Sequence, residues 1–291
     1  MSAFTPPVTA VREVVARALA EDLTPLGDVS AALLPPGSTA EAELRTREDG
    51  VVAGTDCVDE VMAQVDGRLE VTWSVTDGDA VAAGDVLGRA SGPSPSMLTA
   101  ERTALNLLCH LSGVASLTRR FVAAAGPDLR VWDTRKTTPG LRSLEKAAVR
   151  AGGGASHRGN LSEWVMLKDN HLELVSMADA VARARALFPA RTVHIECDTH
   201  EKVVEALEAD ADALLLDNMS PDEARRCVAA VDAHAAAVGR RRPLVEVSGG
   251  ITLETVATYA DVGADLVSSG SITISAPSLD IGLDVTVTRP G

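Results

Sequence analysis

The C-terminal half of the chain repeats one pattern, in which a short apolar run ends in polar residues and a segment with helical spacing follows. Apolar runs of this length suit buried strands, and their alternation with helices is typical of a parallel α/β sheet. The six runs span residues 129–136, 164–170, 192–198, 213–218, 244–250 and 265–270. The helical segments between them span residues 145–151, 178–188, 200–209, 222–238 and 253–262. We therefore expect six βα units.

The polar residues stand at the C-terminal end of every run, which distinguishes between two ways of arranging such a sheet. A (β/α) barrel builds its active site from the carboxyl ends of several strands. An open doubly wound sheet concentrates its chemistry at one switch point, and no Gly-x-Gly-x-x-Gly motif follows the first run. We therefore expect a barrel with its site at the carboxyl ends of the strands.

The first 125 residues follow a different pattern. Apolar positions in residues 8–21 share one helical face, whereas residues 40–46 and 69–75 alternate as half-buried antiparallel strands do. Residues 76–87 form a turn-rich segment that resembles the hairpins of biotin- and lipoyl-carrier domains, but it has no lysine to modify, so we interpret it as structural. Residues 96–125 predict one or two helices. The sequence thus indicates a separate N-terminal α/β domain.

Composition excludes several classes of protein. The 291 residues carry a formal net charge of −14, which argues against a general nucleic-acid binder or a basic membrane-surface protein. No apolar stretch approaches the roughly 18 residues of a membrane span, and the N-terminus has no signal-peptide pattern, so we expect a cytoplasmic protein. The four cysteines have no paired spacing, so we expect free thiols rather than disulfides or a zinc site: Cys57, Cys109, Cys197 and Cys227.

Cations gather in three segments of this acidic chain. Any anionic ligand must meet such a local cluster, because the net charge of the protein repels it. Only four of the 27 cationic residues are lysines, and two of these four belong to the cluster, where a compact point charge has a use that arginine does not replace. With the neighbouring His157, the members are Arg102, Arg135, Lys136, Arg142, Arg158 and Lys168.

Carboxylates end two other strands. Glu196 and Asp217 suit a hydrated Mg²⁺ or the hydroxyl groups of a sugar. Asp198 directly precedes a helix that begins near Thr199, and we interpret it as the cap of that helix.

Small residues end the last two strands, at residues 248–250 and 268–271. Their exposed backbone N–H groups can bind a phosphate, as happens after the final strands of many barrels. Together with the cations and carboxylates, these turns indicate a phosphosugar and a second anionic substrate. Because Lys168 stands at a strand end, a Schiff-base aldolase is an alternative.

Several strings along nearly the whole chain resemble the quinolinate phosphoribosyltransferase family, also called nicotinate-nucleotide pyrophosphorylase (carboxylating). They lie at residues 101–106, 111–114, 133–142, 152–154, 157–158, 168–171, 216–218 and 248–250. Residues 133–142 and 168–171 are highly specific, whereas the Ser-Gly-Gly of residues 248–250 is common.

The resemblance implies a fold and a reaction. The fold is an N-terminal α/β sandwich, here residues 1–115 completed by the tail 279–291, with an open (β/α) barrel of residues 116–278, as in type II phosphoribosyltransferases. The reaction joins quinolinate to phosphoribosyl pyrophosphate with Mg²⁺ and yields nicotinate mononucleotide, pyrophosphate and CO2 for NAD biosynthesis. The family also implies a homodimer.

The resemblance also assigns roles by matching position. It assigns the quinolinate carboxylates to Arg135, His157, Arg158 and Lys168, with Arg102 supplied by the neighbouring subunit. It assigns phosphoribosyl pyrophosphate and its metal to Lys136, Glu196 and Asp217. It assigns the 5′-phosphate to Ser248, Gly249, Gly250, Gly270 and Ser271. The catalytic residues it implies are Lys136, Lys168, Glu196 and Asp217.

Three positions depart from the family pattern. Asn160 and Glu163 stand where Gly and Asp are usual in the loop after the His-Arg pair, and Ile274 stands where many members have His. These departures leave open a ModD-like paralogue, of the kind associated with molybdenum transport, that shares the fold. A non-catalytic phosphosugar-binding barrel is a further alternative, which the retained carboxylates Glu196 and Asp217 argue against.

Overall fold

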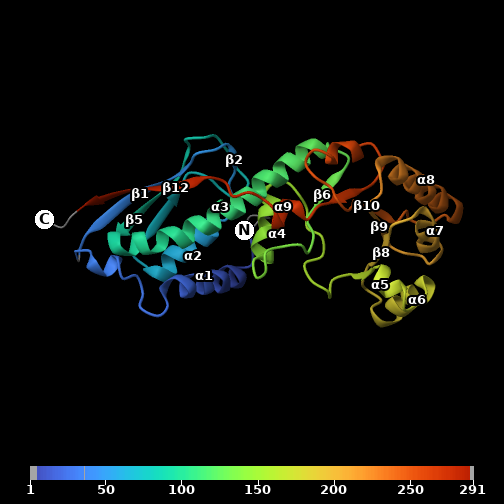
Figure 1. Ribbon diagram of the computed structural model, residues 1–291, viewed down its shortest axis with the longest axis horizontal. Coiled ribbons are helices and arrows are strands. Elements are labelled where there is room, and N and C mark those ends of the chain that lie inside the picture. Colours follow the sequence, from blue (N-terminus) through green and yellow to red (C-terminus); the bar gives the residue numbers. More distant parts are fainter. Residues whose placement is uncertain (1–4, 36, 289–291) are drawn as a thin grey trace. The chain divides into compact units, whose positions relative to one another are not determined.

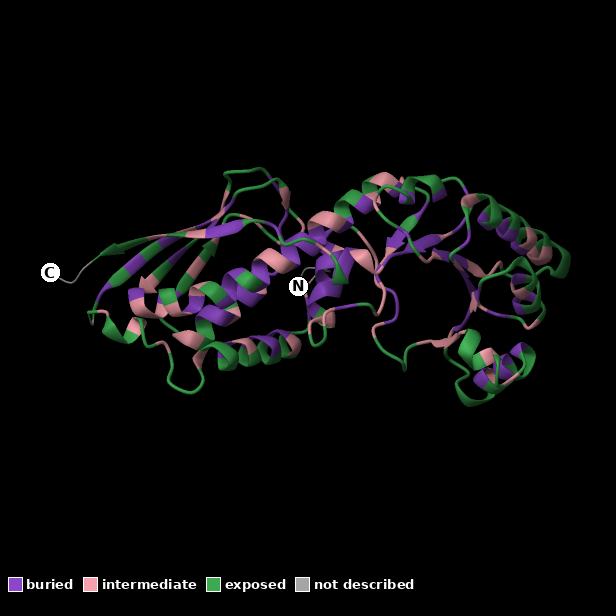
Figure 2. Ribbon diagram, viewed as in Figure 1, coloured by how far each residue is buried: buried purple, intermediate pink, exposed green. Residues whose placement is uncertain are grey.

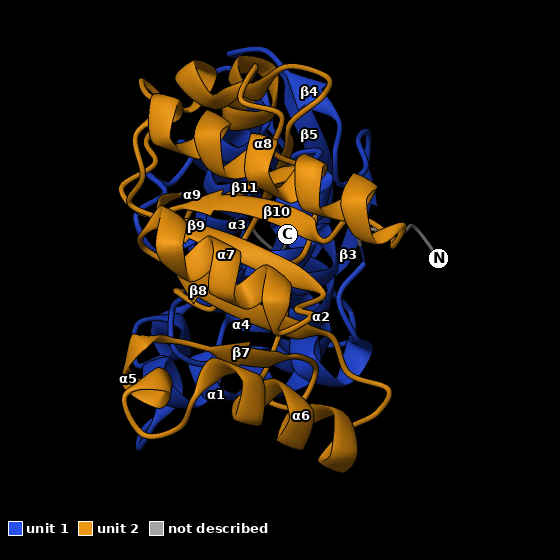
Figure 3. Cartoon of the chain, turned by 90° about the vertical axis from the view of Figure 1, so that its right-hand side faces the viewer, with its two compact units in different colours: residues 1–119, 137–153, 272–291 blue, residues 120–136, 154–271 orange. Residues whose placement is uncertain are grey.

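The computed structural model describes residues 5–35 and 37–288, which form two compact units (Figure 3). Unit 1 contains the residues up to 119, residues 137–153 and the residues from 272 on. Unit 2 contains residues 120–136 and 154–271. None of the helices in the described ranges is both long enough and apolar enough to cross a membrane.

Unit 1 is built on an antiparallel sheet with the strand order β12-β1-β5-β3 (Figure 1). Its strands are β1 (Thr39–Thr46), β3 (Glu70–Trp73), β5 (Val86–Pro93) and β12 (Ile281–Thr288). Buried and more exposed residues alternate along β1, as expected of a strand with one face on a core. The C-terminal strand β12 pairs with the whole length of β1, so the tail of the chain completes the N-terminal sheet, as the resemblance implies.

Helices complete unit 1. Residues 96–125, for which one or two helices are predicted, belong to a single helix, α3. The helices are α1 (Val8–Leu23), α2 (Thr55–Val65), α3 (Ser94–Ala125, to residue 119), α4 (Arg142–Ala151) and most of α9 (Ser271–Ile274). Shorter elements are the 3₁₀ turn η1 (Ala31–Leu33) and the two-stranded ladder of β2 (Gly50–Val51) with β4 (Ala80–Val81).

A glycine in the middle of α3 lets the chain pass close to this helix. A Cβ atom on Gly113 would lie 1.9 Å from the backbone oxygen of Pro277 and 2.9 Å from Cα of Ser278. The same crossing is held by a hydrogen bond of 2.9 Å from the Leu279 N–H to the Cys109 carbonyl. The backbone on the other side of the contact has no rotamer with which to avoid the new atom.

We therefore expect Gly113→Ala to destabilise the protein. Overpacking a close contact typically costs about 1–3 kcal/mol, here set against the small gain in helix propensity of alanine. Gly67→Ala is the matched control, since a Cβ there meets no atom within 4 Å. Urea unfolding of both variants measures the difference, and equal midpoints for the two would contradict the close contact.

Unit 2 contains a parallel sheet with the strand order β6-β11-β10-β9-β8-β7. All six predicted strands are confirmed: β6 (Arg130–Trp132), β7 (Val165–Leu167), β8 (Val193–Cys197), β9 (Ala213–Asp217), β10 (Leu244–Ser248) and β11 (Leu266–Ser268). The end strands β6 and β7 are not neighbours in the ladder of described strands, which makes the barrel open. The central strands are largely buried (Figure 2), as strands covered on both faces should be.

Helices cover the outer face of this sheet (Figure 3). They are α6 (Met177–Leu187), α7 (His200–Glu208) and α8 (Pro221–Val238), with the short α5 (Asp169–Leu172) after β7. The helix predicted at residues 222–238 is confirmed and begins one residue earlier: the hydroxyl of Ser220 accepts from the Glu223 N–H, and Pro221 occupies the first turn.

The predicted helix at residues 253–262 is wrong. The segment forms only a 3₁₀ helix, η2 (Val256–Tyr259). Threonine side chains bond to the local backbone instead of leaving it to a longer helix: Thr255 Oγ1 accepts from the Thr252 N–H at 3.0 Å, and Thr258 Oγ1 donates to the Thr255 carbonyl at 2.7 Å.

The predicted cap of α7 is also wrong by one residue. Thr199 is the N-cap, and its hydroxyl accepts from the Lys202 N–H at 3.3 Å. Asp198 instead forms an ion pair with the Lys202 ammonium at 2.8 Å. Both side chains compete for the same turn, and the threonine has the backbone geometry of the cap.

The prediction of free thiols is confirmed for all four cysteines. Burial raises the pKa of Cys57 and of Cys197 to about 12, so neither thiol ionises at neutral pH. These residues fill the core and supply no reactive thiolate.

Candidate active site

A cavity of about 330 Å³ opens at the carboxyl ends of the unit 2 strands. It brings together cations from separate segments, namely Arg135, Lys136, Arg158 and Lys168. It also brings together three carboxylates, Glu196, Asp217 and Glu246. Further polar lining comes from His157, Ser248, Gly249 and Ser268. Polar residues that are far apart in the sequence thus share one site, as expected for a barrel.

The segment that carries His157 is tied to the end of β6. Asp133 is fully buried, and its Oδ1 accepts from the His157 N–H at 2.8 Å. Its own N–H donates to the Ala155 carbonyl at 3.1 Å. These two bonds place the His-Arg pair beside the Arg135-Lys136 pair that follows the strand.

Two guanidinium groups approach each other in the cavity. Burial, and next the positive charge of Arg135, hold the pKa of Arg158 below its ordinary value. Arg158 also donates to the Trp164 carbonyl at 3.4 Å. Placing like charges together costs free energy that an anion between them recovers, so this part of the cavity suits a carboxylate.

Lys168 is fixed by a hydrogen bond from its backbone and by an ion pair of its side chain. Its N–H donates to Nδ1 of His171 at 3.0 Å, which explains why these residue types are spaced three apart at the start of α5. Its ammonium forms an ion pair with the carboxylate of Glu196 on the neighbouring strand. Two residues with different predicted ligands are therefore direct partners in this structure.

Glu196 and Asp217 end adjacent strands of the sheet. Glu196 lies beside Leu215 in the β8–β9 register, two residues before Asp217. Both carboxylates line the cavity, and carboxylate oxygens are ligands that Mg²⁺ prefers. The donor set therefore fits the expected cation.

The glycine turn after β10 has a tertiary reason. Gly249 and Gly250 have φ angles of +88° and +61°, which favour glycine. A Cβ on Gly249 would also lie 2.4 Å from Oδ1 of Asn218, a residue that itself has a φ of +56°. Asn218 and the glycine turn fit together, and Ser248 and Gly249 of this turn line the cavity.

The turn after β11 also lies near the cavity. A Cβ on Gly270 would meet Cδ of Lys136 at 2.7 Å, so this glycine makes room for the lysine stem. The hydroxyl groups of Ser269 and Ser271 are 2.8 Å apart. Ile274, one of the departures, is half exposed in the following helix α9.

The other two residues that depart from the family pattern, Asn160 and Glu163, are hydrogen-bonded to each other. Nδ2 of Asn160 donates to Glu163 Oε1 at 3.1 Å, and Glu163 Oε2 accepts from the Gly159 N–H at 2.7 Å. Oδ1 of Asn160 accepts from the Ser162 N–H at 2.8 Å. The loop after the His-Arg pair is thus closed by the two unusual residues themselves.

Two expected cations belong to unit 1. Arg102 is exposed on α3. Arg142 begins α4, and its Nε donates to Thr137 Oγ1 at 3.0 Å. Both residues are therefore placed by a different part of the chain from the cavity residues.

Sequence reasoning missed a carboxylate that lines the cavity, Glu246, and the histidine that lies 3.5 Å from it, His194. His194 and Glu246 lie inside strand runs rather than at their ends, and both are buried. Burial lowers the pKa of His194 to about 4. The signal was present, because an ionisable side chain inside an otherwise apolar parallel strand has to be paired or functional.

Family models match most of the chain. The model described as "Quinolinate phosphoribosyl transferase, N-terminal domain" matches residues 28–112, and that of the C-terminal domain matches residues 114–284.

Similar proteins include a nicotinate-nucleotide pyrophosphorylase (carboxylating) from Mycobacterium leprae (strain TN), 40% identical over 95% of this chain and 97% of the relative. A quinolinate phosphoribosyltransferase (decarboxylating) 1 from Nicotiana glauca is 36% identical over 96% of this chain and 83% of the relative. Among solved structures, a nicotinate-nucleotide pyrophosphorylase from Francisella tularensis superposes with a TM-score of 0.89 and 34% identity, over 97% of this chain and 98% of the other.

Proposed function

The chain belongs to the quinolinate phosphoribosyltransferase family, and from that premise we propose that it makes nicotinate mononucleotide from quinolinate and phosphoribosyl pyrophosphate. Pyrophosphate and CO2 are the other products, and the reaction serves NAD biosynthesis. The observation that carries the proposal is the cavity, which joins a cluster of four cations to two strand-end carboxylates and a glycine turn.

Quinolinate occupies the cationic part of the cavity. Arg135, Arg158 and Lys168 face its two carboxylates together with His157. The mutual repulsion of the guanidinium groups, which holds the pKa of Arg158 low, is relieved when a dianion binds between them. Planar guanidinium groups also match the shape of a carboxylate, which orients the pyridine ring.

Phosphoribosyl pyrophosphate occupies the other part. Its 5′-phosphate binds at the turns Ser248–Gly250 and Gly270–Ser271, where glycine lets the backbone approach an anion closely. Lys136 stabilises the negative charge of the departing pyrophosphate. Glu196 and Asp217 would hold Mg²⁺, which neutralises charge on the pyrophosphate.

The chemistry then follows from the orientation of the two substrates. The pyridine nitrogen of quinolinate attacks the anomeric carbon of the sugar, and the bond to pyrophosphate breaks. The resulting pyridinium accepts the electron pair of the adjacent carbon–carbon bond, so the neighbouring carboxylate leaves as CO2 and a proton takes its place. The protein contributes positioning and charge stabilisation.

The alternative functions explain fewer features of this cavity. A non-catalytic phosphosugar-binding barrel would use the carboxylates and the glycine turn, but it has no need for a site that binds a second anion. A ModD-like paralogue would bind a different substrate in the same fold. The loop departures Asn160 and Glu163 bond to each other and so retain an ordered loop. We further propose that the enzyme is a cytoplasmic homodimer.

We expect strong selection for the diacid. Nicotinate lacks one of the two carboxylates that the cations pair with, and a site built for a charged group rejects an analogue without it by about 10³-fold or more in kcat/KM. Nicotinate mononucleotide formed from each acid with phosphoribosyl pyrophosphate measures the ratio. Equal turnover of nicotinate and quinolinate, or no product from either, would exclude the proposed function.

A further inference from the structure

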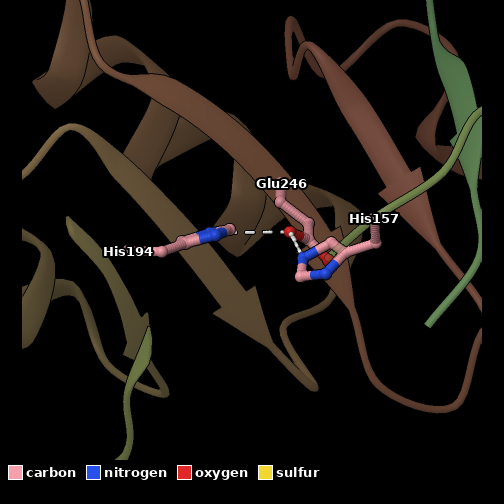
Figure 4. Close-up of side chains that lie close together, drawn as sticks. All are labelled: His157, His194 and Glu246. Atoms are coloured by element: carbon pink, nitrogen blue, oxygen red, sulfur yellow. Dashed lines mark hydrogen bonds and ion pairs between the residues drawn. The ribbon is translucent and has the colours of Figure 1, made fainter. Parts of the chain in front are cut away.

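Glu246 is a buried carboxylate in the middle of β10 whose two oxygens have different partners. Its Oε2 lies 3.1 Å from Nε2 of His157 and 3.5 Å from Nε2 of His194 (Figure 4). Its Oε1 accepts a hydrogen bond from the hydroxyl of Ser268 on the neighbouring strand β11. The residue is 1% exposed, yet it lines the cavity.

A charge in this position has to be paired, because an isolated buried carboxylate is strongly unfavourable. Burial raises the pKa of Glu246, but the hydrogen bond from His157, the electrostatic effects of His194 and His157, and the hydrogen bond from Ser268 together more than offset this, so the pKa lies below its ordinary value. Of the two imidazoles beside Oε2, His157 lies at 3.1 Å and His194 farther away at 3.5 Å. The imidazole that is hydrogen-bonded to Glu246 is therefore His157.

The same three side chains could also be considered as a metal site. One ligand-type atom from each lies within 4.8 Å of the others. The guanidinium of Arg158 acts electrostatically on both His194 and Glu246, and Arg135 acts on Arg158. These positive charges oppose a divalent cation, so the cluster fits a hydrogen-bonded network better than a metal site.

The network controls the ring of His157. The backbone of this residue is fixed by Asp133, a bond that does not involve the ring. The ring packs against Trp164 at a centroid distance of 4.4 Å, a contact that a ring turned by 180° about Cβ–Cγ would retain. The contact between Nε2 and Glu246 distinguishes these two orientations of the ring.

We propose that Glu246 is a positioning residue for quinolinate, which acts through His157 by binding Nε2 of its imidazole and so fixing the orientation of the ring. This inference rests on the proposed function, since quinolinate is the ligand that His157 would contact. Glu246 does not touch the substrate in this account; its effect passes through the imidazole.

Ser268 extends the network toward the glycine turn. Its hydroxyl lies 2.9 Å from the hydroxyl of Ser248, the first residue of that turn. A hydroxyl has one proton, and the carboxylate is the stronger acceptor, so Ser268 donates to Glu246, while the Ser248 hydroxyl donates to the Ser268 carbonyl at 3.5 Å. Ser268 thus keeps Oε1 of Glu246 occupied and leaves Oε2 to the imidazole.

The first test is Glu246→Gln, which keeps the size of the side chain but removes its charge. We expect KM for quinolinate to rise about 10- to 100-fold, because a hydrogen bond to a charged group is lost, while KM for phosphoribosyl pyrophosphate changes less than about threefold. Calorimetric titration with quinolinate should show the same loss of affinity. Ser268→Ala should raise KM for quinolinate in the same direction by a smaller factor, and it replaces the first test if Glu246→Gln does not fold.

A double-mutant cycle separates positioning from a general structural effect. In a His157→Asn background, Glu246→Gln should raise KM by less than about twofold, because the group it acts through is gone. Glu145→Gln is the matched control: Glu145 is also fully buried and 2.8 Å from a histidine, His110, but it does not line the cavity. It should leave KM for quinolinate unchanged even if it lowers stability.

The outcomes are distinct. A wild-type protein that makes no nicotinate mononucleotide overturns the proposed function. An active wild type with an unchanged KM in Glu246→Gln, or an effect of full size in the His157→Asn background, overturns the positioning role alone. An equal rise in KM from Glu145→Gln also overturns it, because the effect would then follow from lost stability.

Discussion

Replacing Lys168 by alanine is expected to lower kcat/KM for quinolinate by about 10²–10³-fold, mainly through weaker binding. The lysine lines the cavity, and removing one partner of a close charge pair typically costs about 2–5 kcal/mol. Part of that cost falls on Glu196, whose carboxylate loses the ammonium that now pairs with it. Steady-state kinetics with each substrate varied in turn measure the effect.

Lys202→Ala is the matched control for this variant. Lys202 is also paired with a carboxylate, Asp198 at 2.8 Å, but it does not line the cavity. An exposed pair of this kind contributes little to stability, so the variant should retain wild-type kinetics. A loss of similar size in both variants would show that the effect of Lys168 is not specific to the site.

The same residue decides between the transferase and an aldolase. A Schiff base requires an amine that is free to attack a carbonyl carbon, whereas the side chain of Lys168 forms an ion pair with Glu196. Treatment with borohydride in the presence of quinolinate and phosphoribosyl pyrophosphate should therefore leave the mass of the Lys168 peptide unchanged. A reduced adduct on that peptide would favour the aldolase.

A mixture of Arg102→Ala and Lys168→Ala proteins, each nearly inactive, is expected to regain about a quarter of wild-type activity after they are refolded together. We propose that each site combines the cavity of one subunit with Arg102 of the other, as the family resemblance implies. In a two-fold dimer, a mixed pair then holds one intact site and one doubly damaged site. Random pairing makes half of the dimers mixed, which gives the expected quarter.

The control mixture combines Lys136→Ala with Lys168→Ala. Both lysines line the cavity of one chain, so every site in a mixed dimer lacks one of them and no activity should return. Native mass spectrometry verifies that mixed dimers are present in both mixtures. Mixed dimers of the first kind that are no more active than the separate variants would exclude a shared site.

Much of the barrel was predictable because its signals are local. Each strand of unit 2 is a short apolar run, and each run predicts its strand regardless of what lies beside it. The helix predicted at residues 253–262 does not form, because its threonine side chains form hydrogen bonds to the backbone. The spacing of apolar residues gives no information about that competition. The N-cap of α7 was assigned to the wrong residue for a similar reason, since aspartate and threonine, here Asp198 and Thr199, are both favoured at an N-cap.

The site was predictable in part. Residues at strand ends could be expected to converge, because parallel strands present their carboxyl ends on one side, and nine of the predicted site residues do line the cavity. The pairing of Lys168 with Glu196 was not predictable, since it depends on the order of β7 and β8 in the sheet. Glu246 and His194 were overlooked because site residues were expected at the ends of the strand runs, whereas these two residues lie inside the runs.

The sequence by itself determined the alternation of strands and helices, the family, and the residue types that end the strands. These are properties of neighbouring residues and of motifs with fixed spacing. Only the tertiary structure decided which charges meet: that Glu246 faces His157 across 89 positions of sequence, and that the tail strand β12 pairs with β1. Such partners are brought together by strand order and register, and the energy of a buried charge depends on them rather than on its neighbours in the chain.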